Sequence, residues 1–309
     1  MLIRRLECTE VVRERAEKHV KKITVKDGAD FEFLSLEISQ KDGGIDVSMS
    51  KYVRSLLEEW GGTEKSASPA EPDFMKDDES SAKLGAAEKE IFHRRVARLL
   101  FLAKRIAPDI LLAVSVLAGH VKEPTLQDWD RLDRVYRYLN GSKDRVLQFW
   151  RGGKVEVSLF VDAAFACHAD MKSRTGAVLL CCGCFVAAWT SKQTQNTKSS
   201  TESELVGLTD ECGWLIWARN WMLEQGYPPM VPVIYQDNTS VVDILKRGPS
   251  AQLRTRHLGI RHHFVGDLIK RDEVKIEYCR TEDMVADMLT KPLIGQQFRK
   301  LRDVLVRVN

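Results

Sequence analysis

The pattern of hydrophobic and polar residues divides the chain into two parts with different periods. Before residue 150, most apolar positions recur at the spacing of one helical face. An extended stretch covers 31–38, and the helical patterns cover 48–60, 91–106, 109–120 and 124–141. Residues 61–88 are rich in Ser, Ala, Pro, Lys and Asp without an apolar period, so we expect a surface connection there. The first part, residues 1–150, is therefore predicted to be mostly helical.

The second part, residues 151–309, alternates between strand and helix patterns. Strands are expected at 155–161, 175–182, 184–190, 231–236 and 274–278. Helices are expected at 201–224, 239–247 and 257–271, and a last one from about residue 282. Three consecutive antiparallel strands, joined to two more through helical crossovers, make a five-stranded mixed sheet with flanking helices. The pattern predicts an α/β domain preceded by the smaller helical region.

Sequence signals for helix N-termini occur in both parts of the chain. Thr125 is a typical N-cap residue, and Asp128 follows it three residues later. Thr201 and Glu204 have the spacing of a capping box for the helix at 201–224.

Composition and charge change this picture little. The chain has 309 residues, of which 44% are hydrophobic and 29% charged, with a net charge of +3, so only local clusters of charge could indicate nucleic-acid binding. The first residues are dense in Arg, Lys and Glu, unlike a signal peptide, and the longest apolar run, 177–189, is too short to cross a bilayer. We therefore expect an intracellular protein, in a cytoplasmic particle or the nucleus, without a membrane partner.

The seven cysteines favour reduced thiols, because their number is odd and no secretory signal accompanies them. Cys167, His168, Cys181, Cys182 and Cys184 match no standard zinc-ligand spacing. We interpret the cysteines as residues that pack within strands.

Four acidic residues lie where predicted elements begin or end. Asp162 ends an alternating strand, Glu204 lies in the first turn of a helix, Asp237 follows an apolar run, and Asp287 lies in an apolar helical stretch. Each could be a solvated surface charge, and Glu202 is an alternative to Glu204. Acids at such positions can converge above a mixed sheet, where they repel one another unless divalent cations lie among them. This charge pattern is typical of a two-metal site that cleaves phosphodiester bonds.

Seven motifs surround these acids in order along the chain. They are VDAAFA (161–166), KSRTG (172–176), WTSKQ (189–193), SSTESEL (199–205), YQDN (235–238), RTRHLGIRHHF (254–264) and TEDMVADMLTKPL (281–293). The series resembles the ribonuclease H domain of copia-type LTR retrotransposons. Two positions depart from common patterns: Ala164 stands where many copia-type domains have a second Asp, and no His precedes Asp287 as it does in many cellular ribonucleases H.

The resemblance extends upstream of the acids. The segments FLSLEI (33–38), SKYV (50–53), FHRR (92–95), LLFLA (99–103) and PDI (108–110) are similar to the C-terminal part of the copia-type reverse transcriptase. In that family the catalytic Asp pair of the polymerase lies before this region. The resemblance thus implies that residues 1–150 are a truncated thumb- or connection-like region without a polymerase active site. Asp77 and Asp78 lie in the polar connection, so we reject them as a polymerase motif and expect no DNA synthesis.

For residues 151–309 the resemblance implies a ribonuclease H fold that cuts the RNA strand of RNA–DNA hybrids. Asp162 would contact both of two Mg²⁺ ions, for which Mn²⁺ could substitute. Asp287 would hold the ion beside the attacking water, and Glu204 and Asp237 would hold the other. Glu204 would also sense the ribose 2′-hydroxyl. The expected partners are the hybrid and the remainder of the reverse transcriptase.

A basic segment at 246–275 lies between the third and fourth acids. It could be a solvated helix face, but beside the acidic site we interpret it as a surface that follows phosphates. The candidate nucleic-acid-binding residues are Asn238, Arg254, Arg256, His257 and Arg261. Trp214, Trp217 and Trp221 recur at helical spacing, and we interpret them mainly as core residues.

The main alternative to an active nuclease is a non-catalytic nucleic-acid-binding or relic fragment of a Pol polyprotein. The intact set of four acids favours the nuclease, whereas the missing polymerase core favours the alternative. A transposase or integrase of the same fold class is disfavoured because those enzymes space their acids differently.

Overall fold

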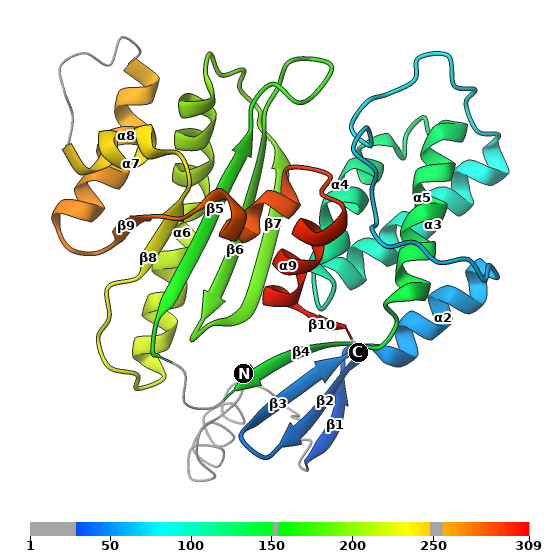
Figure 1. Cartoon of the computed structure of the whole chain (residues 1–309), viewed down its shortest axis with the longest axis horizontal. Helices are drawn as coiled ribbons and strands as arrows, with labels where there is room; N and C mark the ends of the chain where they lie inside the picture. Colours follow the sequence, from blue (N-terminus) through cyan, green and yellow to red (C-terminus); the bar gives the residue numbers. More distant parts are fainter. Residues whose placement is uncertain (1–28, 151–153, 248–255, 309) are drawn as a thin grey trace, which may run out of the picture.

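The computed structural model describes residues 29–150, 154–247 and 256–308, with the backbone alone for 256–262 (Figure 1). The chain forms two five-stranded β-sheets with helices packed around them. The predicted α/β class, with a five-stranded mixed sheet and flanking helices, is confirmed. Within these described ranges, no helix is both long and apolar enough to cross a membrane.

The first sheet is antiparallel and has the order β1-β2-β3-β4-β10. Its strands are β1 (Asp30–Phe33), β2 (Leu36–Lys41), β3 (Gly44–Ser48), β4 (Arg145–Trp150) and β10 (Arg307–Val308). The single strand predicted at 31–38 is in fact two strands, because Leu34 and Ser35 adopt φ angles of 49° and 65° and turn the chain back on itself. The region before residue 150 was predicted to be mostly helical, and this sheet is present there in addition to the helices.

Four helices and a short 3-10 turn pack beside this sheet, toward the right of Figure 1. They are α2 (Ser50–Trp60), α3 (Ala86–Ala103), η1 (Pro108–Ile110), α4 (Leu111–His120) and α5 (Leu126–Gly141). Their apolar faces, with residues such as Val53, Leu99, Leu117 and Leu139, form the first hydrophobic core. The predicted connection after α2 contains no helix or long strand before α3.

The second sheet has the mixed order β7-β6-β5-β8-β9. Its strands are β5 (Val157–Ala164), β6 (Arg174–Cys181), β7 (Cys184–Lys192), β8 (Val233–Gln236) and β9 (Lys275–Tyr278). Strands β5, β6 and β7 are joined antiparallel, whereas β8 and β9 run parallel to β5. This is the arrangement predicted from the sequence, with three consecutive antiparallel strands followed by two reached through helical crossovers.

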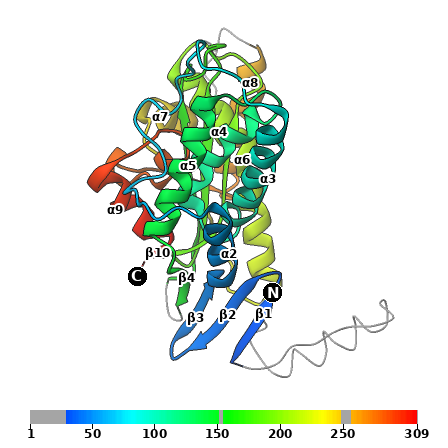
Figure 2. The same ribbon diagram turned by 90° about the vertical axis from the view of Figure 1, so that its right-hand side faces the viewer.

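Other elements cover both faces of the second sheet (Figures 1 and 2), and the two faces belong to different hydrophobic cores. Leu159 and Leu179 face the second core, which lies under α6 (Ser200–Glu224), α7 (Thr239–Arg247) and α8 (Arg256–Lys270). Phe160 and Leu180, the next residue in each strand, face the first core instead. Since side chains alternate along a strand, both faces of this sheet are covered.

The C-terminal segment runs over the face of the second sheet that belongs to the first core. Two 3-10 turns, η2 (Thr281–Asp283) and η3 (Val285–Leu289), precede α9 (Gly295–Leu305) and β10. The helix predicted from residue 282 is therefore wrong at its start. Pro292 has no N–H group and disfavours a helical conformation at the residue before it, so the α-helix begins only at Gly295.

Candidate active site

Two neighbouring parallel strands bring two acids to the same edge of the second sheet. Asp162 lies near the C-terminal end of β5, and Asp237 directly follows β8. Phe160 pairs with Tyr235 in the parallel ladder, so each acid lies two residues beyond a matched pair. Asp162 is only 1% exposed, whereas Asp237 is half-buried. The edge where parallel strands end is a common place for functional side chains in α/β proteins.

Asp287 reaches the same edge from η3. The turn is anchored by buried apolar residues such as Val285, which belong to the first core. A Cβ atom on Gly176 would lie 2.8 Å from the side chains of Leu289 and Thr290. Glycine at this position of β6 therefore allows the turn to lie directly on the sheet.

The three acids form one cluster at this edge. Each of Asp162, Asp237 and Asp287 offers a carboxylate oxygen, and these three atoms lie within 4.8 Å of one another. Their elements are far apart along the chain, so only the tertiary fold brings them together.

Glu204, the fourth predicted acid, is buried beside this cluster on the first turns of α6. Its Oε2 accepts a hydrogen bond of 3.2 Å from the Gln236 side-chain amide, and the backbone of Ala163 donates to its carboxylate as well. Burial, followed by the charges of Asp162 and Asp237, raises the pKa of Glu204 well above its ordinary value. Glu204 is thus close enough to the cluster to share its electrostatics.

The N-terminus of α6 differs from the predicted capping box at Thr201 and Glu204. Ser199 is the N-cap residue, and its hydroxyl accepts a hydrogen bond of 3.2 Å from the Glu202 N–H. The Glu202 carboxylate in turn accepts the Lys198 N–H at 2.8 Å. Glu202 is therefore occupied by the helix terminus, and Glu204 is directed to the acidic cluster instead.

Ionising all the acids of this buried cluster is unfavourable. Burial, and then the charge of Asp162, raises the pKa of Asp237 and of Asp287. These shifts show that the ionised forms are held in an unfavourable environment. Carboxylate oxygens are the ligands that Mg²⁺ and Mn²⁺ prefer, and a bound cation would offset the repulsion. The residues present therefore fit a divalent-metal site.

Three neighbours of the cluster, Lys291, Thr290 and Thr281, were not found by the sequence analysis. Lys291 Nζ lies 2.8 Å from Asp287 Oδ1 and 3.3 Å from Asp162 Oδ1, and the Thr290 hydroxyl donates to Asp162 Oδ2. Burial alone would lower the pKa of Lys291, but the charges of Asp162 and Asp287 raise it above its usual range. The spacing of Asp287 and Lys291, four residues apart, was the available signal. Thr281 likewise donates to Asp237 Oδ2 at 3.1 Å.

Comparison with known proteins identifies relatives along most of the chain. The retrovirus-related Pol polyprotein from transposon RE2 of Arabidopsis thaliana is 27% identical over 90% of this chain and 19% of its own length. The corresponding polyprotein from transposon TNT 1-94 of Nicotiana tabacum is 26% identical over 84% of this chain and 20% of its own length. An uncharacterized mitochondrial protein of A. thaliana is 31% identical over 60% of this chain and 77% of its own length. Homologues of this chain are thus retrovirus-related Pol polyproteins of copia-type transposons.

The chain spans about a fifth of the length of the Pol polyproteins it matches. No protein-family model matches it. Among solved structures, LC11-RNase H1 isolated from compost is 12% identical, covers 44% of this chain and 92% of its own, and has a TM-score of 0.35. The N-terminal RNase H domain of a Mycobacterium tuberculosis protein is 15% identical, covers 44% of this chain and 91% of its own, and has a TM-score of 0.31.

Among the described residues, the structure places only one of the predicted nucleic-acid-binding side chains. Asn238 caps α7, since its Oδ1 accepts the Val241 N–H at 3.3 Å, and its own N–H donates to Gln236 Oε1 at 3.0 Å. Arg254 lies outside the described residues. Arg256, His257 and Arg261 belong to α8, in the stretch whose side chains lie outside the description. Their proposed contacts with phosphates stay a prediction.

The prediction that the tryptophans of α6 are mainly core residues is wrong for two of them. Trp214 and Trp217 are 44% and 53% exposed. Trp214 stacks on Trp189 of β7 with ring centroids 5.0 Å apart, and Trp217 meets Trp214 edge-on. Trp221 alone packs against the second core, half-buried.

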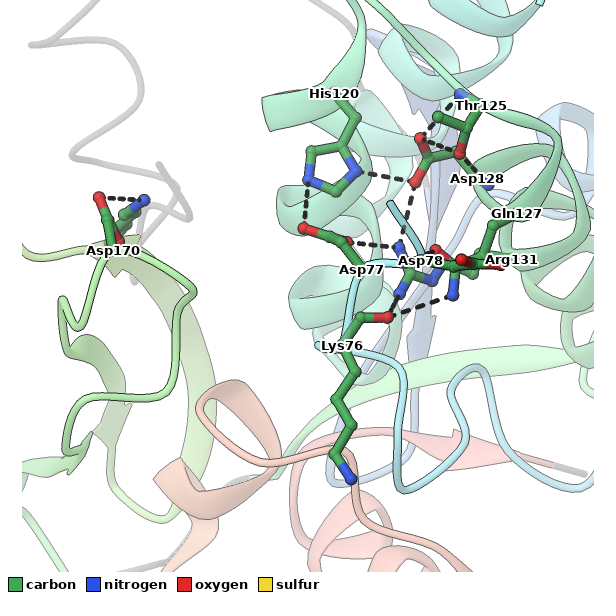
Figure 3. Close-up of polar contacts among 10 residues, drawn as sticks. Lys76, Asp77, Asp78, His120, Thr125, Gln127, Asp128, Arg131 and Asp170 are labelled. Carbon is green, nitrogen blue, oxygen red and sulfur yellow. Dashed lines mark hydrogen bonds and ion pairs between the residues drawn. The ribbon is translucent and has the colours of Figure 1, made fainter. Parts of the chain in front are cut away.

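Of the neighbouring acids Asp77 and Asp78, Asp77 belongs to a group of charged side chains around the buried Arg131 (Figure 3). Asp77 Oδ1 lies 3.0 Å from Arg131 Nη1, and that guanidinium lies 3.2 Å from Asp128 Oδ1. His120 Nδ1 completes the group 2.7 Å from Asp128 Oδ1. Asp77 therefore joins the connection after α2 to the N-terminus of α5, which supports its rejection as a polymerase motif.

Proposed function

We propose that this protein is a ribonuclease H that hydrolyses the RNA strand of RNA–DNA hybrids with two Mg²⁺ ions, for which Mn²⁺ can substitute. The observation that supports it is the convergence of Asp162, Asp237 and Asp287 at one edge of a mixed sheet, with Glu204 buried beside them. The relatives favour the same reaction, because they are retrovirus-related Pol polyproteins.

In this proposal the four acids hold the metal ions. Bound Mg²⁺ supplies an activated water and stabilises the charge on the leaving 3′ oxygen. The chain's own hydroxyl groups keep the ligands in place: Thr290 donates to the Asp162 carboxylate, and Thr281 donates to that of Asp237. Oriented ligands lose less freedom when a cation binds.

Specificity for the RNA strand is assigned to Glu204. Its carboxylate lies at the start of α6, beside the cluster, and it is held by the Gln236 amide. A carboxylate in this place would accept a hydrogen bond from a ribose 2′-hydroxyl, the group that distinguishes RNA from DNA. The basic segment with Arg254, Arg256 and Arg261 would follow the phosphates of the hybrid.

We assign residues 151–309 to the nuclease and residues 1–150 to a region like the C-terminal part of the reverse transcriptase. The first region would support the nuclease and contact the remainder of the polymerase, without synthesising DNA. The packing of α4 and α9 against β7 favours a structural role for the first region, since it joins the two regions through one hydrophobic core.

A cleavage assay with a matched pair of variants tests the proposal. Purified chain is incubated with Mg²⁺ and an RNA–DNA hybrid labelled on each strand, beside Asp162→Asn and the control Asp170→Asn. Asp170 is an exposed acid that pairs with Lys192, so its loss should leave cleavage unchanged. We expect cleavage of the RNA strand only, reduced to background by Asp162→Asn, while binding of the hybrid persists.

Two results would contradict this proposal. Cleavage by Asp162→Asn at the wild-type rate would remove the acidic cluster from the reaction. A folded wild-type protein that binds the hybrid without cutting it would instead favour the non-catalytic or relic alternative.

A further inference from the structure

Lys291 is a positive charge inside the acidic cluster. Its ammonium group lies between Asp162 and Asp287, 3.3 Å and 2.8 Å from one oxygen of each. The two carboxylates are almost fully buried, whereas 41% of the Lys291 side chain is exposed. The lysine therefore enters the cluster from the solvent side at the end of a flexible stem.

Both oxygens of Asp162 are engaged by this one segment of chain. Oδ1 contacts Lys291, and Oδ2 accepts a hydrogen bond from the Thr290 hydroxyl. A divalent cation that binds Asp162 must therefore share or replace one of these partners. Thr290 is buried, so its hydroxyl has little room to move. Lys291 has an open path to solvent and is the partner that can leave.

We infer that Lys291 is a built-in counter-ion that competes with the divalent cation for Asp162 and Asp287, and so sets the metal affinity of the site. The inference rests on the proposed function, since it assumes that these acids bind metal. A lysine suits this role because it is a compact charge on a rotatable stem, with no rigid bidentate contact to break. Like charges a few ångströms apart repel strongly where water is partly excluded.

Removing Lys291 should change the metal affinity in opposite directions if the lysine is a competing counter-ion or if it belongs to an ordinary structural ion pair. A structural pair would leave Asp162 and Asp287 poorly placed once the lysine is removed, so metal would bind more weakly. A competing counter-ion would leave the carboxylates free for metal, so the cation would bind more tightly. The direction of the change in affinity separates the two roles.

The test measures Mn²⁺ binding by calorimetry with the full chain. Lys291→Met keeps the length of the stem and removes the charge, and we expect it to lower the Kd for Mn²⁺ about tenfold. Lys291→Arg keeps the charge and should not lower the Kd. Lys300→Met removes a lysine that pairs with Asp283 outside the cluster, so it is the matched control and should not change the Kd.

Thermal unfolding gives a second readout that does not depend on cleavage. In chelator, Lys291→Met should melt below wild type because two buried acids lose their counter-ion. Added Mn²⁺ should raise its melting temperature more than that of wild type, because the stabilisation by a bound ligand grows with the logarithm of the ligand's affinity. Lys291→Gln serves in the same two measurements if the methionine variant does not fold.

The outcomes distinguish this inference from the proposed function. Metal binding by wild type with equal or weaker binding by the neutral variants would overturn the counter-ion role. Tighter binding by those variants in a protein that cuts no hybrid would support the role while the nuclease proposal fails. An absence of Mn²⁺ binding in folded wild type and neutral variants alike would overturn both.

Discussion

Glu204 is buried among charges of its own sign. Its carboxylate is 5% exposed, and the donors closest to it are the Gln236 amide and the backbone of Ala163. The nearby Asp162 and Asp237 add to the cost of ionising it. A carboxylate in this position favours a proton or a metal ion over a bare negative charge.

We predict that the metal-free protein loses stability as the pH rises. The pKa of Glu204 is raised above its ordinary 4.5 by burial and by Asp162 and Asp237, and that of Asp287 is raised by burial and by Asp162. The folded protein therefore holds protons that the unfolded chain has released, so the free energy of unfolding falls from about pH 4.5 toward the raised folded values. Melting temperatures in chelator across this range measure the slope.

Glu204→Gln should flatten this slope, because it removes one of the groups that titrate. Glu224→Gln changes an exposed acid at the far end of the same helix and should not flatten it. If the Glu204→Gln protein loses stability as steeply as wild type, the pH dependence arises outside the acidic cluster.

The acids of the site could be predicted from the sequence, whereas their cationic and hydroxyl partners could not. Asp162 and Asp237 follow apolar strands, which is a local signal visible without the fold. Lys291 and Thr290 meet Asp162 only because the segment after β9 lies on β6. Nothing near Lys291 in the sequence shows which strand that segment will cover.

At the scale of elements, the start of a helix could be predicted where the sequence contains a single candidate N-cap residue. Thr125 accepts the Asp128 N–H at 3.3 Å, and the Asp128 carboxylate accepts the Thr125 N–H at 2.9 Å, as predicted for α5. At α6 several Ser, Thr and Glu residues compete within one turn, and the chosen pair, Thr201 and Glu204, was wrong. The choice among them is made by tertiary contacts, which direct Glu204 to the sheet edge.

The docking of η3 on β6 should depend on the absence of a side chain at residue 176. Gly176→Val places carbon where Leu289 and Thr290 already lie, so η3 must shift and carry Asp287 away from the cluster. We expect a loss of about 1–3 kcal/mol in the free energy of unfolding from overpacking. Mn²⁺ affinity should fall with it. Urea unfolding and calorimetry measure the two effects.

Gly213→Ala is the matched control for this substitution. Gly213 lies in α6, and a Cβ atom there meets no other atom within 4 Å. Alanine in a helix should leave stability unchanged or raise it by up to about 1 kcal/mol. Unchanged metal binding in Gly176→Val would show that the position of η3 does not determine the site.

On the scale of the whole molecule, one hydrophobic core joins the two predicted regions. Val178, Leu180 and Phe185 of the second sheet share this core with the helices that precede β4. Strand β10 also returns to the first sheet, where Arg307 pairs with Val146. The sequence predicts each region by its local periods, but it gives no signal for apolar faces that are shared between them.

We predict that residues 154–309 will not form a stable domain when expressed alone. Without the helices before β4, the apolar residues Val178, Leu180 and Phe185 would face water, and β10 would lack its partner strand. The fragment should bind a hydrophobic dye and give a poorly dispersed NMR spectrum. Residues 29–150 added in trans should restore dispersion, and a fragment that is well folded without them would contradict the prediction.

The return of β10 to β4 has a consequence for the time at which the acidic cluster forms. Asp287 lies between β9 and β10, on a segment whose far end is fixed only when Arg307 pairs with Val146. Pairings between residues so distant along a chain form late in folding. As a chain emerges from the ribosome, Asp162 and Asp237 are therefore made and ordered well before Asp287 joins them. We expect the acidic cluster of a nascent chain to stay incomplete until synthesis has passed β10.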